Sequence, residues 1–335
     1  MKSDPISGAI MDSNNLIPKI DLQQQAGKSV DSQTAAIRAA CEETGFFVIT
    51  GHDISTAVME ACRDAAIDFF DRPISEKKRV QQLTPGSPYG YSPMAQETLA
   101  RSRGDNTPPD LKESYSIGPP TPRPQPINPD EAIFAATPNR WPDAPANFRT
   151  AFEAYYKAMN NFADILMRRF AVALDLPEDF FLPFIRHSIS ALRANHYPPL
   201  ASAPSAGQLR AGAHSDYGTL TILMQNSGSD GLEIQNRNGQ WLPVTGEAPD
   251  LIVNIGDLMA RWTNDHWVSS VHRVVVPNDA HSRQQRRLSL AYFHQPDWDA
   301  EIRCIPSCLP DKEQPIYPPI RSGRYLMEKF HSTVL

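Results

Sequence analysis

Two histidines and an aspartate late in the chain could bind a metal. His214 and Asp216 are separated by one residue, and His272 follows 56 positions after the aspartate. Two imidazole nitrogens and one carboxylate oxygen form a mixed donor set that holds iron(II) on one face and leaves its other positions open. We therefore expect His214, Asp216 and His272 to be the metal ligands and the catalytic centre.

An arginine and a serine with strand spacing follow the second histidine. Arg287 and Ser289 belong to a segment in which side chains of two kinds alternate, so both should point to the same face of a strand. An arginine on the inner face of a strand needs a partner, and an anionic ligand is the simplest one. Because a guanidinium can grip a carboxylate with two parallel hydrogen bonds, the pattern predicts a carboxylate ligand beside the metal.

The segments around these residues have the composition of short β-strands. Runs of β-branched and apolar residues, separated by turn residues, predict strands at 189–197, 217–225, 231–236, 240–244, 250–254, 258–262, 270–276 and 287–294. Asn238-Gly239 has the composition of a hairpin turn. About eight strands without intervening helices indicate a double-sheet jelly roll that keeps its ligands inside.

Helical periodicity appears before this region and at the end of the chain. It predicts helices over 32–43, 55–70 and 148–174 and around 325–330, with short strands over 17–22 and 45–50. We expect the helix from 148 to brace a sheet. Residues 84–147 are rich in proline and glycine, which favours an extended loop that could line the entrance to the iron.

The segment with the ligands resembles the isopenicillin N synthase-like branch of the iron(II)/2-oxoglutarate-dependent dioxygenases. That family has H-x-D, a second histidine some fifty-odd residues later, and then R-x-S. Two more motifs are similar to its patterns: Asn195-His196-Tyr197-Pro198-Pro199 to its N-x-Y-P-P strand, and Asn254-Ile255-Gly256-Asp257 to its N-x-G-D turn. Segments 17–22, 45–52, 90–91 and 110–113 resemble its N-terminal domain, so the resemblance covers roughly residues 16 to 300.

The resemblance implies a fold, cofactors and residue roles. The fold would be mixed α/β, mainly β, with a double-stranded β-helix (jelly roll) core, flanking N-terminal helices and a long bracing helix. The cofactors would be iron(II), the cosubstrate 2-oxoglutarate and O2. The cosubstrate would be held by Arg287, Ser289, Tyr197 and Asn195. Candidates for substrate contact are Tyr217, Leu223, Trp262 and Phe293, together with segment 111–116 and its Tyr115.

The implied activity is the oxidation of a small organic metabolite, with release of succinate and CO2. Hydroxylation, desaturation and cyclisation all suit such a site, and a role in specialised metabolism is expected. One alternative is an oxidase of the isopenicillin N synthase type, which uses R-x-S for a substrate carboxylate and does not use 2-oxoglutarate. Another is a small-molecule binding or sensing protein without turnover, but the intact set of three ligands argues against it.

Composition limits the partners. The 335 residues carry a net charge of −6, which gives no basic field for nucleic acid or an anionic membrane. No stretch approaches 18 apolar residues, and the N-terminus lacks the apolar core of a signal peptide. The four cysteines do not form a zinc pattern, which suggests reduced thiols. We expect a cytoplasmic protein with a small-molecule substrate and no nucleic-acid or membrane partner; its oligomeric state stays open.

The motifs divide the chain into five parts. We expect a disordered N-terminus at 1–15, an N-terminal dioxygenase region with the proline-rich loop at 16–147, and a bracing helix region at 148–186. The double-stranded β-helix with the iron and 2-oxoglutarate site would occupy 187–300, and a C-terminal extension with a helix would occupy 301–335.

Overall fold

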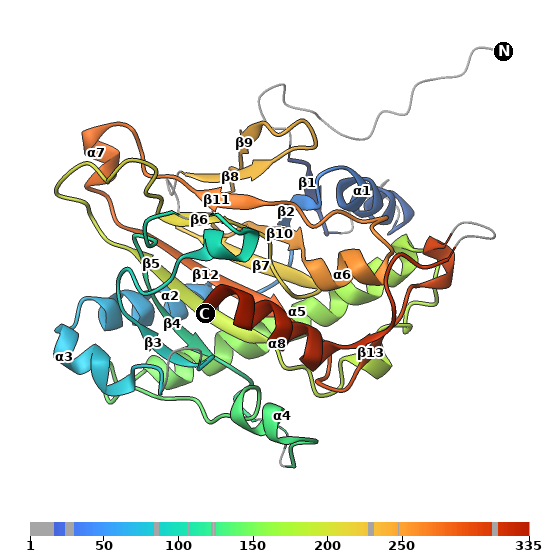
Figure 1. Ribbon diagram of the computed structural model, residues 1–335, viewed down its shortest axis with the longest axis horizontal. Helices are drawn as coiled ribbons and strands as arrows, with labels where there is room; N and C mark the ends of the chain where they lie inside the picture. Colours follow the sequence, from blue (N-terminus) through green and yellow to red (C-terminus); the bar gives the residue numbers. More distant parts are fainter. Residues whose placement is uncertain are drawn as a thin grey trace.

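The computed structural model describes most of the chain. The described residues are 17–23, 30–83, 87–105, 107–121, 123, 125–226, 231–246, 248–309 and 314–334. The N-terminal segment 1–15, expected to be disordered, lies outside them. Two stacked sheets and the helices on the outer face of the larger sheet form the body of the protein (Figure 1).

The larger layer is an eight-stranded sheet. From one edge to the other its strands are β1 (Lys19–Asp21), β2 (Phe46–Thr50), β10 (Leu251–Ile255), β7 (Leu220–Gln225), β12 (Arg287–His294), β5 (Ala191–Tyr197), β4 (Glu113–Ile117) and β3 (Gly90–Ser92). All neighbours are antiparallel except β1 and β2. The central strand β12 places Arg287 opposite Tyr197, and Ser289 opposite both Asn195 and Gln225.

The smaller layer is an antiparallel four-stranded sheet. Its order is β6 (Ala211–His214), β11 (His272–Val274), β8 (Leu232–Gln235) and β9 (Trp241–Pro243). Apolar side chains of both sheets share one buried cluster, which includes Phe46 and Ile252 from the large sheet and Ile234 and Val274 from the small one. These facing antiparallel sheets confirm the predicted jelly-roll core. A separate pair, β13 (Glu301–Ile302) with β14 (Ile320–Arg321), lies outside it.

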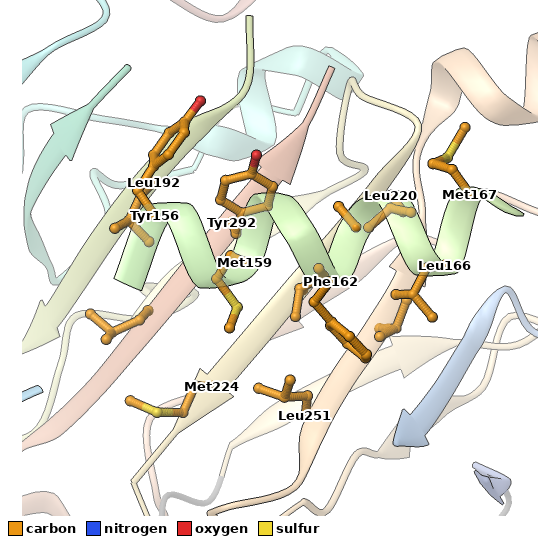
Figure 2. Close-up of a cluster of buried hydrophobic side chains, with 14 of the residues drawn as sticks. Tyr156, Met159, Phe162, Leu166, Met167, Leu192, Leu220, Met224, Leu251 and Tyr292 are labelled. Carbon is orange, nitrogen blue, oxygen red and sulfur yellow. The ribbon is translucent and has the colours of Figure 1, made fainter. Parts of the chain in front are cut away.

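Helices cover the outer face of the large sheet. The longest is α5 (Phe148–Ala173), which packs beside α1 (Val30–Glu43) and α2 (Thr56–Phe70). Figure 2 shows Met159, Phe162 and Leu166 of α5 against strand residues such as Leu192 and Leu220. The predicted bracing helix is therefore confirmed. The other helices are α3 (Ile74–Lys77), α4 (Pro129–Ile133), α6 (Asp257–Trp262), α7 (Ala280–Arg283) and α8 (Ser322–Val334). Among the described residues, none of these helices is long and apolar enough to cross a bilayer.

Alternation along the central strands separates two environments. The apolar even-numbered residues of β5 and β12, including Leu192, Leu290 and Tyr292, belong to the core cluster formed with α5. The odd-numbered residues of the same strands line a cavity between the two sheets. Because successive side chains of a strand point to opposite faces, one strand both anchors the bracing helix and presents polar groups to the cavity.

Three sequence-based expectations about elements were wrong. Residues 258–262 form most of helix α6 rather than a strand, because leucine, methionine, alanine and arginine favour a helix. Strand β6 was missed, since its alanines and glycine have weak strand propensity. The presumed loop 84–147 contains β3 and β4, which extend the large sheet beyond β5. That segment nevertheless does contribute to the cavity wall, as expected.

Candidate active site

The two sheets bring His214, Asp216 and His272 together. His214 ends β6 and is the cross-strand partner of His272, the first residue of β11, while Asp216 lies in the loop after β6. Oδ1 of Asp216 is 3.9 Å from Nε2 of His214 and 3.7 Å from Nε2 of His272. All three ligand atoms lie within 4.8 Å of one another, close enough to hold one metal ion.

Hydrogen bonds orient the rings of both histidines so that their Nε2 atoms face Asp216. Nδ1 of His214 lies 2.7 Å from the Gly212 carbonyl oxygen, and Nδ1 of His272 lies 3.2 Å from the Ser270 carbonyl oxygen. A carbonyl can only accept, so both Nδ1 atoms carry a proton, and the lone pair of the neutral ring is then on Nε2. This tautomer is the one in which a histidine can bind iron(II) through Nε2.

The aspartate is fixed through its other oxygen. Oδ2 of Asp216 accepts hydrogen bonds from Oγ1 of Thr221 at 2.6 Å and from Nδ2 of Asn254 at 2.7 Å. Thr221 and Asn254 are direct cross-strand partners on β7 and β10, so both donors are positioned by the sheet. Oδ1 is thereby left for a cation, and the donor set fits iron(II).

The protonation states also suit a cation. Burial lowers the pKa of His214 below its ordinary value, and the charge of His272 lowers it further. Burial alone would raise the pKa of Asp216, but the charges of His272 and His214 and the bonds from Thr221 and Asn254 lower it. At neutral pH His214 is therefore neutral and Asp216 ionised, as metal ligands must be.

A glycine allows the aspartate loop to sit close to the sheet. A Cβ atom at Gly256 would lie 2.2 Å from the carbonyl oxygen of Gly218, a distance that no side chain tolerates. The neighbouring amide of Asp257 donates to the Asp216 carbonyl oxygen at 2.7 Å. The turn after β10 therefore holds the backbone of Asp216, while Asn254 holds its side chain.

Arg287 lies in the same cavity without a carboxylate partner. Its side chain is 2% exposed, and Nη2 donates to Oε1 of Gln225 at 2.8 Å while Nη1 lies 3.4 Å from Oγ of Ser289. The guanidinium carbon is 4.9 Å from the centre of the Tyr197 ring. Within the described part of the chain, Arg287 forms no ion pair, and its Nε has no hydrogen-bond partner. A buried cation without a counter-charge is unfavourable, so we expect an anion to bind at Arg287.

A second buried arginine adds to this positive potential. Arg210 precedes β6, is 3% exposed, and donates from Nη2 to the Gln285 carbonyl oxygen at 3.1 Å. Burial lowers the pKa of Arg210, and repulsion from the nearby Arg287 lowers it further. Two guanidinium groups therefore contribute positive charge at this end of the cavity.

The three candidate metal ligands and the residues around Arg287 line one cavity of about 320 Å³. Its wall includes the three candidate ligands and all four residues expected to hold the cosubstrate: Arg287, Ser289, Tyr197 and Asn195. The Oδ1 atom of Asn195 is buried and has no hydrogen-bond partner in the described structure. A metal ion at the three ligands and a carboxylate at Arg287 would therefore share one enclosed space.

Comparisons with known proteins agree with this geometry. Residues 17–144 match the N-terminal family model described as non-haem dioxygenase in morphine synthesis, and residues 188–296 match the 2OG-Fe(II) oxygenase superfamily. The 2-oxoglutarate-Fe(II) type oxidoreductase hxnY of Emericella nidulans is 33% identical over 295 residues, which cover 85% of this chain and 80% of the relative. The chain belongs to the 2-oxoglutarate- and iron(II)-dependent oxygenases.

Other relatives and solved structures are consistent with this family. The proline hydroxylase buaE of Petromyces alliaceus is 33% identical over 287 residues, covering 83% of this oxygenase and 86% of the relative. The crystal structure of a full-length Neurospora crassa protein in complex with alpha-KG has a TM-score of 0.82 and 30% identity, with 98% and 99% of the two chains covered. A 2OG-Fe(II) oxygenase family protein from Caulobacter crescentus also has a TM-score of 0.82 and 30% identity, over 95% and 99%.

The predicted family, reaction class and cofactors are therefore confirmed. The oxygenase is an oxidoreductase that uses iron(II), 2-oxoglutarate and O2. The comparisons do not favour an oxidase that works without 2-oxoglutarate or a binding protein without turnover.

Three of the five residues expected to contact substrate line the cavity. They are Tyr217, Leu223 and Phe293. Trp262 is instead buried on α6, where its ring packs at right angles to Phe184 and close to Phe181. Tyr115 faces the core between the large sheet and α5, in edge contact with Phe148. Both were wrong candidates, since Trp262 is on a helix and Tyr115 on the face of β4 opposite the cavity.

Sequence reasoning missed several polar residues in and around this site. Gln225 holds Arg287, and Thr221 and Asn254 hold Asp216. The alternation of β7 could have found two of them, since Thr221, Leu223 and Gln225 share one face. Glu97 and Arg193 also line the cavity and were not predicted to contact substrate, whereas Lys112 lies in the 111–116 segment that was a candidate.

Removing the support of Asp216 should weaken iron binding without removing a ligand. Thr221→Val keeps the shape of the side chain but loses the hydroxyl donor, and Asn254→Ala loses the amide. Such outer partners contribute about 10- to 100-fold to metal affinity, so we expect anaerobic iron(II) titrations to show a loss of at least tenfold. Thr221→Ser keeps the hydroxyl and should bind iron like the wild type. Equal iron affinity in Thr221→Val and Thr221→Ser would contradict this role.

Proposed function

We propose that His214, Asp216 and His272 bind the iron(II), and that Arg287, Ser289, Tyr197 and Asn195 bind 2-oxoglutarate. The observation that carries this proposal is the unneutralised, buried guanidinium of Arg287 in the same cavity as the three candidate ligands. Arg287 would receive the distal carboxylate with its paired N–H groups, because a planar fork matches a carboxylate.

The residues of the chain bind, orient and exclude water. When bound, iron(II) and 2-oxoglutarate would supply the oxidising chemistry together with O2, which is the oxidant: O2 is reduced while 2-oxoglutarate is converted to succinate and CO2 and the substrate is oxidised. Thr221 and Asn254 hold Oδ2 of Asp216, so that its Oδ1 faces the Nε2 atoms of the two histidines, where the iron(II) would bind. Gln225 fixes Arg287 and is itself tied to the Gly246 carbonyl oxygen at 2.9 Å, so the carboxylate receptor is preorganised.

A small organic substrate suits the remaining space. A volume of about 320 Å³ lies at the lower end of ordinary ligand cavities, and 2-oxoglutarate and substrate must share it. Tyr217, Leu223 and Phe293 offer apolar surface, so we infer a partly apolar metabolite. The solved neighbours include the Neurospora crassa protein with thymine and JOX2 with JA, which are small molecules. We include in this proposal a cytoplasmic location and the absence of nucleic-acid and membrane partners.

Anaerobic titration with iron(II) tests the cofactor assignment. Iron(II) together with 2-oxoglutarate should give the charge-transfer absorption of the chelate, and neither component alone should give it. Admission of O2 should then release succinate, and a substrate should accelerate the release. An enzyme that bound iron but gave no chelate band at saturating 2-oxoglutarate would contradict the proposal.

A further inference from the structure

The cavity contains a second cationic cluster, which includes Arg193 of β5. Along the cavity face of β5, Arg193 lies four residues before Tyr197, the cross-strand partner of Arg287. At roughly 3.3 Å per residue, this places the two arginine positions about 13 Å apart along the strand. Arg193 is therefore separate from the proposed carboxylate receptor for 2-oxoglutarate and faces the space left for substrate.

The Arg193 guanidinium is held by Ser116 and Glu97 through two of its three nitrogens. Its Nε donates to Oγ of Ser116 at 2.9 Å, and its Nη1 lies 3.1 Å and 3.2 Å from the two carboxylate oxygens of Glu97. No contact of Nη2 appears among the described residues. The side chain is 18% exposed and lines the cavity, so Nη2 is the donor left for a ligand.

The Glu97 carboxylate forms ion pairs with two cations in this cluster. The Nζ atom of Lys112 lies 2.8 Å from Oε2 of Glu97, so Glu97 is the ion-pair partner of both Lys112 and Arg193. Burial alone would raise the pKa of Glu97, but the two cations lower it, so it is ionised at neutral pH. Arg101 adds a further positive charge to the cavity wall. Asp110 lies near Lys112, but its two oxygens accept backbone amides.

Apolar groups adjoin this cluster. Ile189 and Ala191 precede Arg193 on the cavity side. Phe134, which follows α4, and Phe330 of α8 also line the wall. In Figure 1, α8 (dark red) lies in front of the strands that carry the site. A ligand here meets a surplus of positive charge next to an apolar surface.

We propose that Arg193, positioned by Glu97 and Ser116 and assisted by Lys112, binds a carboxylate on the substrate. The substrate class is then a small organic acid with an apolar body, held with its charged group at Arg193. This inference deepens the proposed function and rests on it. The Glu97 carboxylate weakens the attraction of the cluster for an acid. It also keeps Arg193 and Lys112 in ion pairs before the acid enters.

Matched acids and amides test this substrate class. The enzyme is loaded anaerobically with iron(II) and saturating 2-oxoglutarate, and the probes are hexanoate and 3-phenylpropionate, each against its primary amide. Binding is read from the change in the chelate band, because an acid that merely displaced 2-oxoglutarate would abolish it. A charge-assisted bond to a half-buried arginine gives an expected preference of at least about tenfold for the acids.

Two variants should move this preference in opposite directions. Arg193→Gln removes the charge and should bring the ratio of acid to amide affinity close to one. Glu97→Gln removes the competing carboxylate with little change of shape and should raise the ratio. Opposite shifts within one cluster cannot come from general unfolding. Arg186→Gln, at an exposed arginine outside the cavity, is the control and should match the wild type.

The possible failures are distinguishable. Amides that bind the wild type as tightly as acids, binding of neither probe pair, or an acid preference that survives in Arg193→Gln would each overturn the inference. In those cases an intact chelate band would leave the proposed function standing. Absence of the band before any probe is added would instead show that the proposed function fails.

Discussion

Replacing Asp216 with alanine should abolish iron retention and turnover together. Asp216 is the anionic member of the ligand cluster, and its Oδ1 faces the Nε2 atoms of both histidines. Without it only the two imidazoles remain, and two donors bind iron(II) far more weakly than three. We expect at least a 100-fold loss of iron affinity, consistent with the effect of losing a whole ligand where an outer partner alone contributes about 10- to 100-fold. Anaerobic iron(II) titration and succinate release measure the two effects.

The control for this prediction is the same substitution on a helix surface. Asp64 lies on α2, its side chain is 61% exposed, and it pairs with the neighbouring Arg63. Asp64→Ala should therefore retain iron and activity. Wild-type iron affinity in Asp216→Ala would show that the metal is held elsewhere.

Substitution of Arg287 should weaken 2-oxoglutarate and leave iron in place. Arg287→Lys keeps a positive charge but loses the planar fork, and Arg287→Ala loses both. A hydrogen bond to a charged group contributes roughly 1.5–3 kcal/mol, and 1.4 kcal/mol is tenfold in affinity. We therefore expect the apparent affinity for 2-oxoglutarate to fall at least about tenfold in Arg287→Lys and further in Arg287→Ala. The iron(II) titration should be unchanged, because Arg287 is not a ligand.

The adjacent arginine provides a matched comparison. Arg286 precedes Arg287, but its side chain points outward, where it forms a two-point pair with Asp71 at 2.7 and 3.0 Å. Arg286→Ala should leave 2-oxoglutarate affinity unchanged. If the wild type proved independent of 2-oxoglutarate and Arg287→Ala weakened only the organic substrate, the oxidase alternative would be correct.

The central features of the site could be predicted because they are local in the sequence. The alternation from Arg287 to Phe293 predicted which side chains share a face, and the structure places Arg287, Ser289 and Phe293 along one cavity. The same reasoning correctly placed the apolar stripe of α5 against the sheet. Periodicity is a strong signal wherever one face of an element is buried.

The rest depends on contacts between distant parts of the chain. Asn254 and Asp216 are 38 residues apart, and Glu97 and Arg193 are 96 residues apart, so no local pattern joins them. Trp262 was misplaced because its segment was predicted as a strand, whereas the structure has a short helix there. Strand β6 has too few β-branched residues to be recognised, and tertiary pairing with β11 determines it.

The alternation of β5 and β12 has a consequence for how such an enzyme can vary. Odd-numbered positions on these strands line the cavity, and the apolar even-numbered positions belong to the core cluster with α5. An exchange at an odd-numbered position, such as Ala291, alters the cavity while the contacts with the bracing helix stay in place. Deletion of one residue within either strand would instead turn a charged side chain such as Arg193 toward the core and a leucine toward the cavity. We therefore expect this scaffold to tolerate substitution at fixed strand length, and to tolerate changes of length only in the loops.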